Sequence, residues 1–537
     1  MLVIGLDGAT FDVINPLIRE GWMPNVKKLV EEGASGTLQS TMPPVTGPAW
    51  LAMATGLTPG KTGIYDFIKR KGENGYKFTF ISSAEYKGRA IWDYLSSSGK
   101  RVCIVNYPTL YPPYEVNGVV VSGGLGSPRL SNFTYPKEVE TEIGEILGYD
   151  RQVNLKDPKY KNLDLFLDDL NDMFRRRVEC TKYLLVNKKW DFFWAVFPET
   201  DWIQHMMWNF IDSSRRCDER EHFKKYTDRI KSFWAQVDKA IGELKNVVGS
   251  EVNVMIVSDH GFGSCHNQSF RLNAWLKREG YFEPKKKAAL IFWSGKKLRR
   301  GLKKIVESLR LDRMFPMAVQ WGKRATTSMA ILVNAIDFRK SIAFDPGHIG
   351  TFGGIYINEH TVKDPVRKER IKKEISDRLS KYGKEKGLDI DIYTPEELYG
   401  SKAENSMDLI VRVNKGACAV EKWGFEEQVV DKLPSRISFL RGTHRINGIF
   451  VASGPDFVHT EVKNARLWDI APTILYCLNE PIPSSMEGVV LSQAIKHEEK
   501  PRYEKEKIAI SRKPGKAALS RDEEDQIRKQ LSDLGYL

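Results

Sequence analysis

Short runs of apolar residues recur along the chain, each bounded by polar or turn-forming positions. Runs of about four to eight apolar residues are typical of buried strands, and longer segments with helical periodicity lie between them. The predicted strands are residues 2–6, 101–107, 119–121, 190–197, 252–257 and 449–452, and the predicted helices include residues 163–187, 223–244 and 468–478. This alternation predicts an α/β fold with a mostly parallel central sheet and helices on both faces.

The composition is that of an ordinary globular protein. The chain has 537 residues, of which 41% are hydrophobic and 28% charged, which excludes a collagen, a long disordered chain and a disulfide scaffold. Its six cysteines form no CxxC pair, so we expect free thiols in a reducing compartment. No apolar run approaches the roughly 20 residues of a membrane span, and the first residues have a buried-strand pattern without a basic leader. We therefore expect a cytoplasmic protein.

The net charge of +13 is concentrated in one segment. Thirteen basic residues and only two acidic ones lie between Pro284 and Arg324, so this window has a net charge of +11 and the remainder a net charge of +2. Apolar residues at near-helical spacing among the lysines and arginines indicate a basic amphipathic helix. It is either a solvated helix packed on its own domain or a contact with an anionic membrane, which would make the protein membrane-associated.

Metal-type ligands lie at or near the predicted strands. Asp7 follows the first strand, Asp201 and His205 share one helix face, the pair Asp259-His260 ends a strand, and His444 precedes one. Each signal alone has an ordinary explanation, such as a helix N-cap, a surface pair or a structural loop histidine. Together the three aspartates and three histidines are enough for two divalent ions, and zinc or manganese would suit imidazole and carboxylate ligands.

The segment that contains Thr46 resembles the nucleophile region of the alkaline phosphatase superfamily. It is most similar to the type I phosphodiesterase/nucleotide pyrophosphatase branch, whose nucleophilic threonine lies nine residues before a TGLxPxxxGI signature. That signature begins here at Thr55, and nine residues before it is Thr46. The ligand motifs listed above and the closing segment DIAPTIL at residues 469–475 follow in the family's order. The resemblance covers residues 1–495, with the basic segment as an interruption.

The resemblance implies a metal-dependent hydrolase of phosphoric monoesters or diesters. It implies an alkaline-phosphatase-like three-layer sandwich with a small insertion or cap, and a phosphothreonine intermediate on Thr46. Zn²⁺ is the expected metal, with Mn²⁺ as the alternative. We also expect Thr46 to be the N-cap of the helix that follows it. The implied ligands are Asp7, Thr46, Asp259 and His260 for one ion, and Asp201, His205 and His444 for the other.

Three residues are candidates for substrate binding: Arg445 beside His444, His266 after Asp259-His260, and Lys69 after the signature. Asp66 and Phe67 stand near the position where the branch has a phosphoryl-binding asparagine, so nucleotide specificity is not implied. We expect a phosphorylated small molecule, or a lipid- or glycan-linked phosphate, as substrate, and we do not expect nucleic acid.

The expected organisation has four segments. Residues 1–283 and 331–497 are the two parts of the catalytic core, residues 284–330 are the basic amphipathic insertion, and residues 498–537 are a charged tail with a short helix. An alternative is a membrane-surface or nucleic-acid binding protein that uses residues 285–324, with the phosphohydrolase site weak or repurposed. The complete ligand set favours the enzyme.

Overall fold

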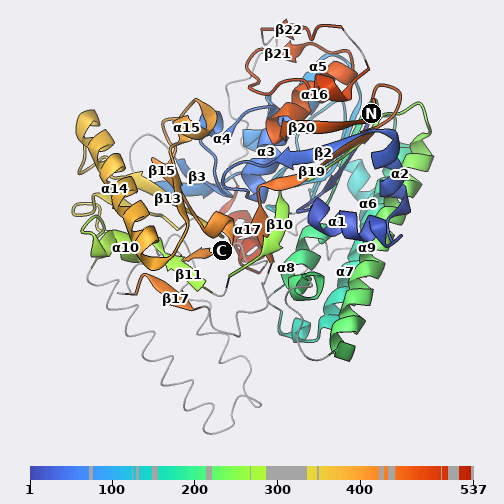
Figure 1. Cartoon of the computed structure of the whole chain (residues 1–537). Helices are drawn as coiled ribbons and strands as arrows, with labels where there is room; N and C mark the ends of the chain where they lie inside the picture. Colours follow the sequence, from blue (N-terminus) through green and yellow to red (C-terminus); the bar gives the residue numbers. More distant parts are fainter. Residues whose placement is uncertain are drawn as a thin grey trace.

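The structure of the chain is a computed structural model (Figure 1). It describes residues 1–71, 76–123, 125–127, 132–147, 155, 157–212, 220–266, 268–285, 335–347, 350–421, 428–432, 442–496, 499–505 and 519–533. The predicted basic insertion at residues 284–330 lies outside the described residues except for its first two positions, and much of the charged tail does too.

A nine-stranded sheet forms the centre of the molecule. Its strand order is β20-β2-β19-β9-β1-β8-β5-β6-β7, and the five neighbouring strands β9, β1, β8, β5 and β6 run parallel. The bounds are β1 Leu2–Leu6, β2 Ala34–Gln39, β5 Val102–Tyr107, β6 Gly118–Ser122, β7 Thr134–Tyr135, β8 Phe192–Phe197, β9 Val254–Val257, β19 Asn447–Ser453 and β20 Thr460–Arg466. The six predicted strands all belong to this sheet, and the predicted α/β class is confirmed.

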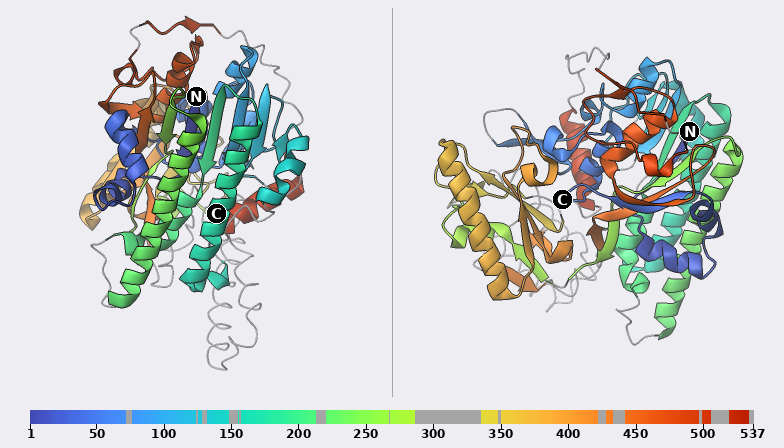
Figure 2. Two further views of the ribbon diagram at one scale, coloured as in Figure 1. Left: turned by 90° about the vertical axis from the view of Figure 1, so that its right-hand side faces the viewer. Right: turned by 45° about the horizontal axis from the view of Figure 1, so that its top comes forward.

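Helices cover both faces of the sheet because successive side chains along its strands point alternately into two hydrophobic cores. In β1, Leu2, Ile4 and Leu6 belong to one core, whereas Val3 belongs to the other. The first core packs against α1 Phe11–Arg19, α2 Pro24–Glu32, α6 Glu138–Leu147, α7 Leu163–Asn187, α8 Glu199–Ile211 and α9 Arg220–Val248. The second packs against α3 Thr46–Thr55, α5 Ile91–Ser97 and α16 Ile470–Cys477. The long helices α7 and α9 run along one side of the sheet (Figure 2).

A second lobe with its own hydrophobic core lies beside the central sheet (Figure 1). It contains a four-stranded sheet in the order β12-β13-β15-β14 and a three-stranded sheet in the order β16-β11-β17. The bounds are α10 Leu272–Arg278, β11 Gln268–Arg271, β12 Ala343–Phe344, β13 Phe352–Ile357, α14 Pro365–Lys386, β14 Ile390–Tyr393, α15 Pro395–Tyr399, β15 Leu409–Val413, β16 Ala419–Glu421 and β17 Val430–Lys432. Sequence analysis predicted only a small insertion or cap and did not separate this lobe from the core.

Short elements complete the described part of the chain. They are helix α4 Pro59–Thr62, the hairpin strands β3 Ile68–Lys71 and β4 Lys77–Phe80, the paired strands β10 Gly261–Ser264 and β18 Gly442–Arg445, and the strands β21 Ile482–Pro483 and β22 Tyr503–Glu504. Single turns of 3₁₀-helix lie at Ser83–Glu85, Pro158–Lys161, Asn414–Gly416, Leu467–Asp469 and Ser492–Ala494. The C-terminal helix α17, Arg521–Asp533, buries Ile527 and Leu531 in the first core. Among the described residues, no helix is both long and apolar enough to span a membrane.

Helix α3 lies close to β1 because Gly5 leaves room for an aromatic ring. A methyl group on Gly5 would lie 2.5 Å from Cη2 of Trp50 and 3.0 Å from Cγ2 of Val196. Trp50 is fully buried, and its indole N–H donates a 3.3 Å hydrogen bond to Asp7, two residues beyond Gly5. The ring therefore connects α3 directly to the carboxyl end of β1.

We expect the Gly5→Ala substitution to lower the free energy of unfolding by about 1–3 kcal/mol, because the added methyl overpacks the contact with Trp50. Gly144→Ala is the matched control, since nothing lies within 4 Å of its added methyl in α6. That control should be neutral, or stabilising by up to about 1 kcal/mol, because alanine favours a helix over glycine. Chemical denaturation measures both, and equal effects would contradict this account of the packing.

Candidate active site

Six ligand-type side chains converge at the carboxyl edge of the central sheet. Asp7 directly follows β1, the pair Asp259-His260 follows β9, and α8, which begins just after β8, carries Asp201 and His205. Because β9, β1 and β8 are parallel neighbours, these three turns meet at one edge. His444 comes from β18, which pairs with β10 immediately after His260. The four aspartate and histidine pieces recognised in the sequence are thus brought together.

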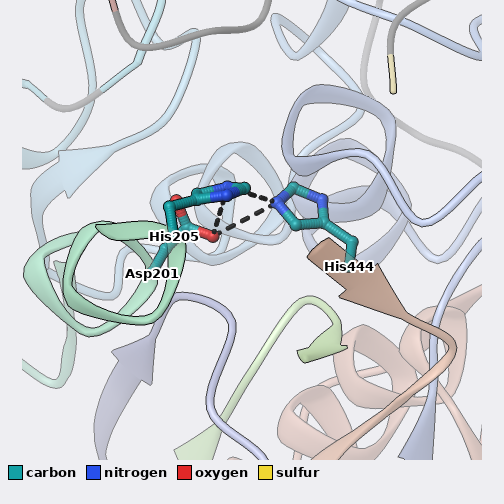
Figure 3. A group of neighbouring side chains, drawn as sticks. All are labelled: Asp201, His205 and His444. Atoms are coloured by element: carbon teal, nitrogen blue, oxygen red, sulfur yellow. Dashed lines mark hydrogen bonds and ion pairs between the residues drawn. The ribbon is translucent and has the colours of Figure 1, made fainter. Parts of the chain in front are cut away.

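Asp201, His205 and His444 form one group (Figure 3). Oδ1 of Asp201 lies 3.4 Å from Nε2 of His205 and 3.2 Å from Nε2 of His444, and the two Nε2 atoms are 3.0 Å apart. The aspartate and His205 are four residues apart on α8, so they extend from the same face of the helix. All three side chains point their ligand atoms at a common position.

His260 is the centre of a second group. Its Nε2 lies 3.2 Å from Oδ2 of Asp259, 3.6 Å from Oδ1 of Asp7 and 3.3 Å from Oγ1 of Thr46. Asp7, Asp201 and His260 also offer ligand atoms that all lie within 4.8 Å of one another. Asp201 therefore lies between the two groups, whereas the resemblance had placed it in one of them only.

Burial controls the electrostatics of the site. The three carboxyl groups are fully buried, and burial together with mutual repulsion raises the pKa of Asp7 well above its usual range. Burial likewise raises the pKa of Asp259 to about 7 and lowers that of His205 to about 4, and it lowers the pKa of His260 well below its usual value. Asp201 differs, because the imidazoles around it outweigh burial and lower its pKa. The imidazoles of His205 and His260 are therefore neutral at pH 7.

Two backbone carbonyls determine which nitrogen of His260 and His444 is available. Nδ1 of His444 lies 2.9 Å from the Pro44 carbonyl, and Nδ1 of His260 lies 3.1 Å from the Gly261 carbonyl. A carbonyl only accepts hydrogen bonds, so Nδ1 of each ring carries a proton, and in the neutral form of the ring Nε2 keeps its lone pair. Each Nε2 is directed into the site, which is the arrangement of a metal-binding histidine.

The side chains fit divalent cations. Oδ1 of Asp7 and Oδ2 of Asp259 are buried and accept no hydrogen bond from the described part of the chain. Buried carboxylates without donors are costly unless they are protonated or bound to a cation. Mixed imidazole and carboxylate ligands are those preferred by zinc and manganese.

Thr46 is the first residue of α3 rather than its N-cap. Val45 occupies the N-cap position with extended backbone angles and makes no side-chain capping bond, so the predicted capping role of Thr46 is wrong. Its hydroxyl is directed instead at His260, and its side chain is fully buried. This leaves the hydroxyl oxygen among the metal-type ligands and at the positive end of the helix dipole.

Several polar residues that sequence analysis missed hold the ligand-bearing turns. Thr200 donates to the Asp7 carbonyl (2.7 Å), Gln204 to the Gly8 carbonyl (2.8 Å), Ser258 to the Ala9 carbonyl (2.8 Å) and Ser40 to the Asp259 carbonyl (2.6 Å). All four are buried. Thr200, Gln204 and Ser258 each directly precede a ligand residue in the sequence. This position is a signal that could have identified them.

The side chains of the three substrate-binding candidates interact with other protein groups. Arg445 donates to the carbonyls of Gly416 (2.8 Å), His444 (2.9 Å) and Ser264. Lys69 forms an ion pair with Glu85, and His266 is exposed with Nδ1 3.4 Å from the amide of Asn414. Asp66 is buried and accepts a 2.7 Å bond from the Phe67 amide. The ring of Phe67 lies over Gly47, next to Thr46.

Comparison with protein families gives a match that covers most of the chain. The family model of type I phosphodiesterase/nucleotide pyrophosphatase matches residues 1–444. No curated protein sequence matches the chain.

Solved structures with a similar fold also exist. Human ectonucleotide pyrophosphatase/phosphodiesterase 5 is 13% identical, with a TM-score of 0.50 over 93% of this chain and 100% of that chain. The murine protein of the same name, inactive and in complex with AMP, is 13% identical with a TM-score of 0.48 over 89% of this chain and 95% of that one. Phosphonoacetate hydrolase from Sinorhizobium meliloti 1021, in complex with phosphonoformate, is 13% identical with a TM-score of 0.49 over 89% and 94%. At this identity, the likeness to the human protein supports the fold alone.

We expect divalent ions to stabilise the folded chain, because they would replace repulsion among the buried carboxylates with attraction. At a free ion concentration about 100-fold above Kd, binding adds about 2.7 kcal/mol to the free energy of unfolding. Thermal unfolding after chelation, and again after Zn²⁺ or Mn²⁺ is restored, measures this effect, with a monovalent salt of equal ionic strength as control. An unfolding midpoint that does not respond to divalent ions would contradict the assignment.

Proposed function

Because the chain belongs to the type I phosphodiesterase/nucleotide pyrophosphatase family and is a phosphoric ester hydrolase, we propose that Thr46 is its nucleophile and that two divalent ions assist it. The observation that carries this proposal is the position of the Thr46 hydroxyl. It lies 3.3 Å from Nε2 of His260, inside a ligand group that shares Asp201 with its neighbour. If Thr46 served only for packing, its buried hydroxyl would not need to be directed at the metal-type ligands.

The two groups of side chains suggest how the ions would be held. Asp7, Thr46, Asp259 and His260 would bind one, and Asp201, His205 and His444 the other, with Zn²⁺ or Mn²⁺ as the metal. When bound, such ions lower the pKa of a coordinated oxygen and neutralise charge on the phosphoryl group and on the leaving oxygen. Asp201, which lies between the groups, would keep the two positions close together.

The residues of the chain then account for the two chemical steps. The Thr46 hydroxyl gives up its proton to solvent and its oxygen attacks phosphorus. As the new bond to phosphorus forms, the bond from phosphorus to the alcohol oxygen breaks, and the departing alkoxide takes up a proton from water. Water hydrolyses the phosphothreonine and restores the free hydroxyl. Because α3 begins at Thr46, the first turn of the helix directs its N–H dipoles toward the phosphoryl group. The carbonyls that fix Nδ1 of His260 and His444 keep both rings oriented throughout.

Substrate preference is a separate proposal. We infer that small monoesters or diesters are accepted, and we do not propose a nucleotide, because Phe67, which stands near the position of the branch's phosphoryl-binding asparagine, packs against Gly47 next to the nucleophile. A lipid- or glycan-linked substrate, cytoplasmic location and peripheral contact with an anionic membrane also stay proposals. The basic segment that motivates the membrane contact lies outside the described residues.

We expect Thr46→Ala to lower kcat for aryl phosphate monoesters and diesters at least about a thousandfold, because the nucleophile is lost. Bound metal should remain, since three other ligands surround that position. Thr62→Ala, which removes a hydroxyl from the nearby helix α4, is the control and should keep wild-type turnover. Steady-state kinetics with metal analysis tests this, and full turnover by Thr46→Ala would exclude the mechanism.

Replacing His205 by alanine should reduce the metal content from about two ions to about one per chain, because only the group that contains Asp201 and His444 loses a ligand. Mass spectrometry of the metal content measures the ratio. His459→Ala is the matched control, since this histidine is exposed and lies between β19 and β20 at the sheet edge where β9 begins, opposite the site. Two ions per chain in the His205 variant would show that the division of ligands is wrong.

A further inference from the structure

The second lobe contacts the loop that precedes the proposed nucleophile. We call residues 40–45 the nucleophile loop. Tyr399, the last residue of α15, directs its hydroxyl at Met42 in this loop. The hydroxyl accepts a 2.7 Å bond from the Met42 amide and donates a 3.0 Å bond to the Met42 carbonyl. One phenol thus satisfies both backbone groups of a residue four positions before Thr46.

The same loop is bonded to the metal-type ligands on its other side. The Pro44 carbonyl accepts a hydrogen bond from Nδ1 of His444, and the Ser40 hydroxyl donates to the carbonyl of Asp259. Within the loop, the amide of Val45 donates to the Pro43 carbonyl at 3.0 Å. A movement of the loop would therefore displace Thr46 and also change the orientation of His444.

Tyr399 is well placed to hold this loop because α15 is itself fixed. A capping box between Thr394 and Glu397 closes the start of the helix, and Gly400 ends it in the left-handed region at φ 68°. The amide of Ala403 donates a 2.7 Å bond to the Gly60 carbonyl. A methyl group on Gly60 would lie 2.7 Å from Cβ of Tyr399, so glycine is required for this close approach.

Two aromatic rings hold the Tyr399 ring. Its centroid lies 6.4 Å from that of Tyr65 and 5.9 Å from that of Trp468, which come from the loop after α4 and from the turn before α16. These ring contacts do not involve the hydroxyl. Removing only the hydroxyl therefore separates its effect on the nucleophile loop from the packing of the lobe.

We propose that Tyr399 is a positioning residue for phosphoryl transfer, which acts by holding the nucleophile loop so that Thr46 and His444 stay aligned. This inference rests on the proposed function. It makes turnover depend on the second lobe, which contributes none of the metal-type ligands identified among the described residues. A displacement of about 1 Å at a reacting group can lower a rate by about 100-fold, so a modest loosening of the loop should be measurable.

The test compares Tyr399→Phe with Tyr65→Phe. Each variant loses one hydroxyl from the same cluster of rings, but the Tyr65 hydroxyl is buried and makes no hydrogen bond to the nucleophile loop. We expect Tyr399→Phe to lower kcat for a small aryl phosphate about tenfold with KM and metal content unchanged, because two hydrogen bonds to the loop are lost. Tyr65→Phe should keep the wild-type kcat.

Hydrogen exchange provides a readout that does not need activity. Mass spectrometry of the peptide that contains residues 40–46 should show faster exchange in Tyr399→Phe than in wild type and Tyr65→Phe. An unchanged kcat, unchanged exchange, or equal changes in both variants would overturn the proposal. If the wild type itself fails to hydrolyse aryl phosphates, the proposed function fails, and the exchange result alone then decides whether Tyr399 holds the loop.

Discussion

The mutual repulsion of three buried carboxylates is the constraint on which the rest of the structure depends. Asp7, Asp201 and Asp259 are all fully buried, and their ligand atoms approach one another across the ends of three parallel strands. Burial raises the pKa of Asp7 and Asp259, while neighbouring imidazoles lower that of Asp201. Such a cluster is stable only when protons or cations balance it. The imidazole Nε2 atoms that converge on these carboxylate oxygens make a divalent cation the better partner.

The protein maintains this cluster with hydrogen bonds among its own buried groups. The hydroxyl groups of Thr200 and Ser258 donate hydrogen bonds to carbonyls of the turn that carries Asp7. Gly5 allows Trp50 to lie against β1, which brings α3 and therefore Thr46 to the same edge. The nucleophile loop connects this frame to the second lobe through Tyr399. Preorganisation of this kind reduces the movement that the reaction itself requires.

Sequence analysis predicted the strands and identified the aspartates and histidines that cluster in the structure, because both leave local signals. The run LVIGL before Asp7 has the pattern of a buried strand, and the four-residue spacing of Asp201 and His205 is a local property of a helix. Three features depended on long-range packing instead. Asp201 lies between the two groups because α8 begins beside β1, Thr46 is the first residue of α3 rather than its cap, and Tyr399 meets Met42 across 357 positions of sequence. The extent of the second lobe was missed for the same reason.

The most direct test of the central claim is to capture the covalent intermediate. The wild-type chain, loaded with divalent ions, is mixed with an aryl phosphate ester, quenched in acid during turnover and digested for peptide mapping by mass spectrometry. The account predicts a phosphoryl group on the peptide that contains Thr46, with fragmentation that assigns it to that residue, and none in Thr46→Ala. Hydrolysis that proceeds at the full rate without a phosphorylated Thr46, or a phosphoryl group on another residue, would contradict it.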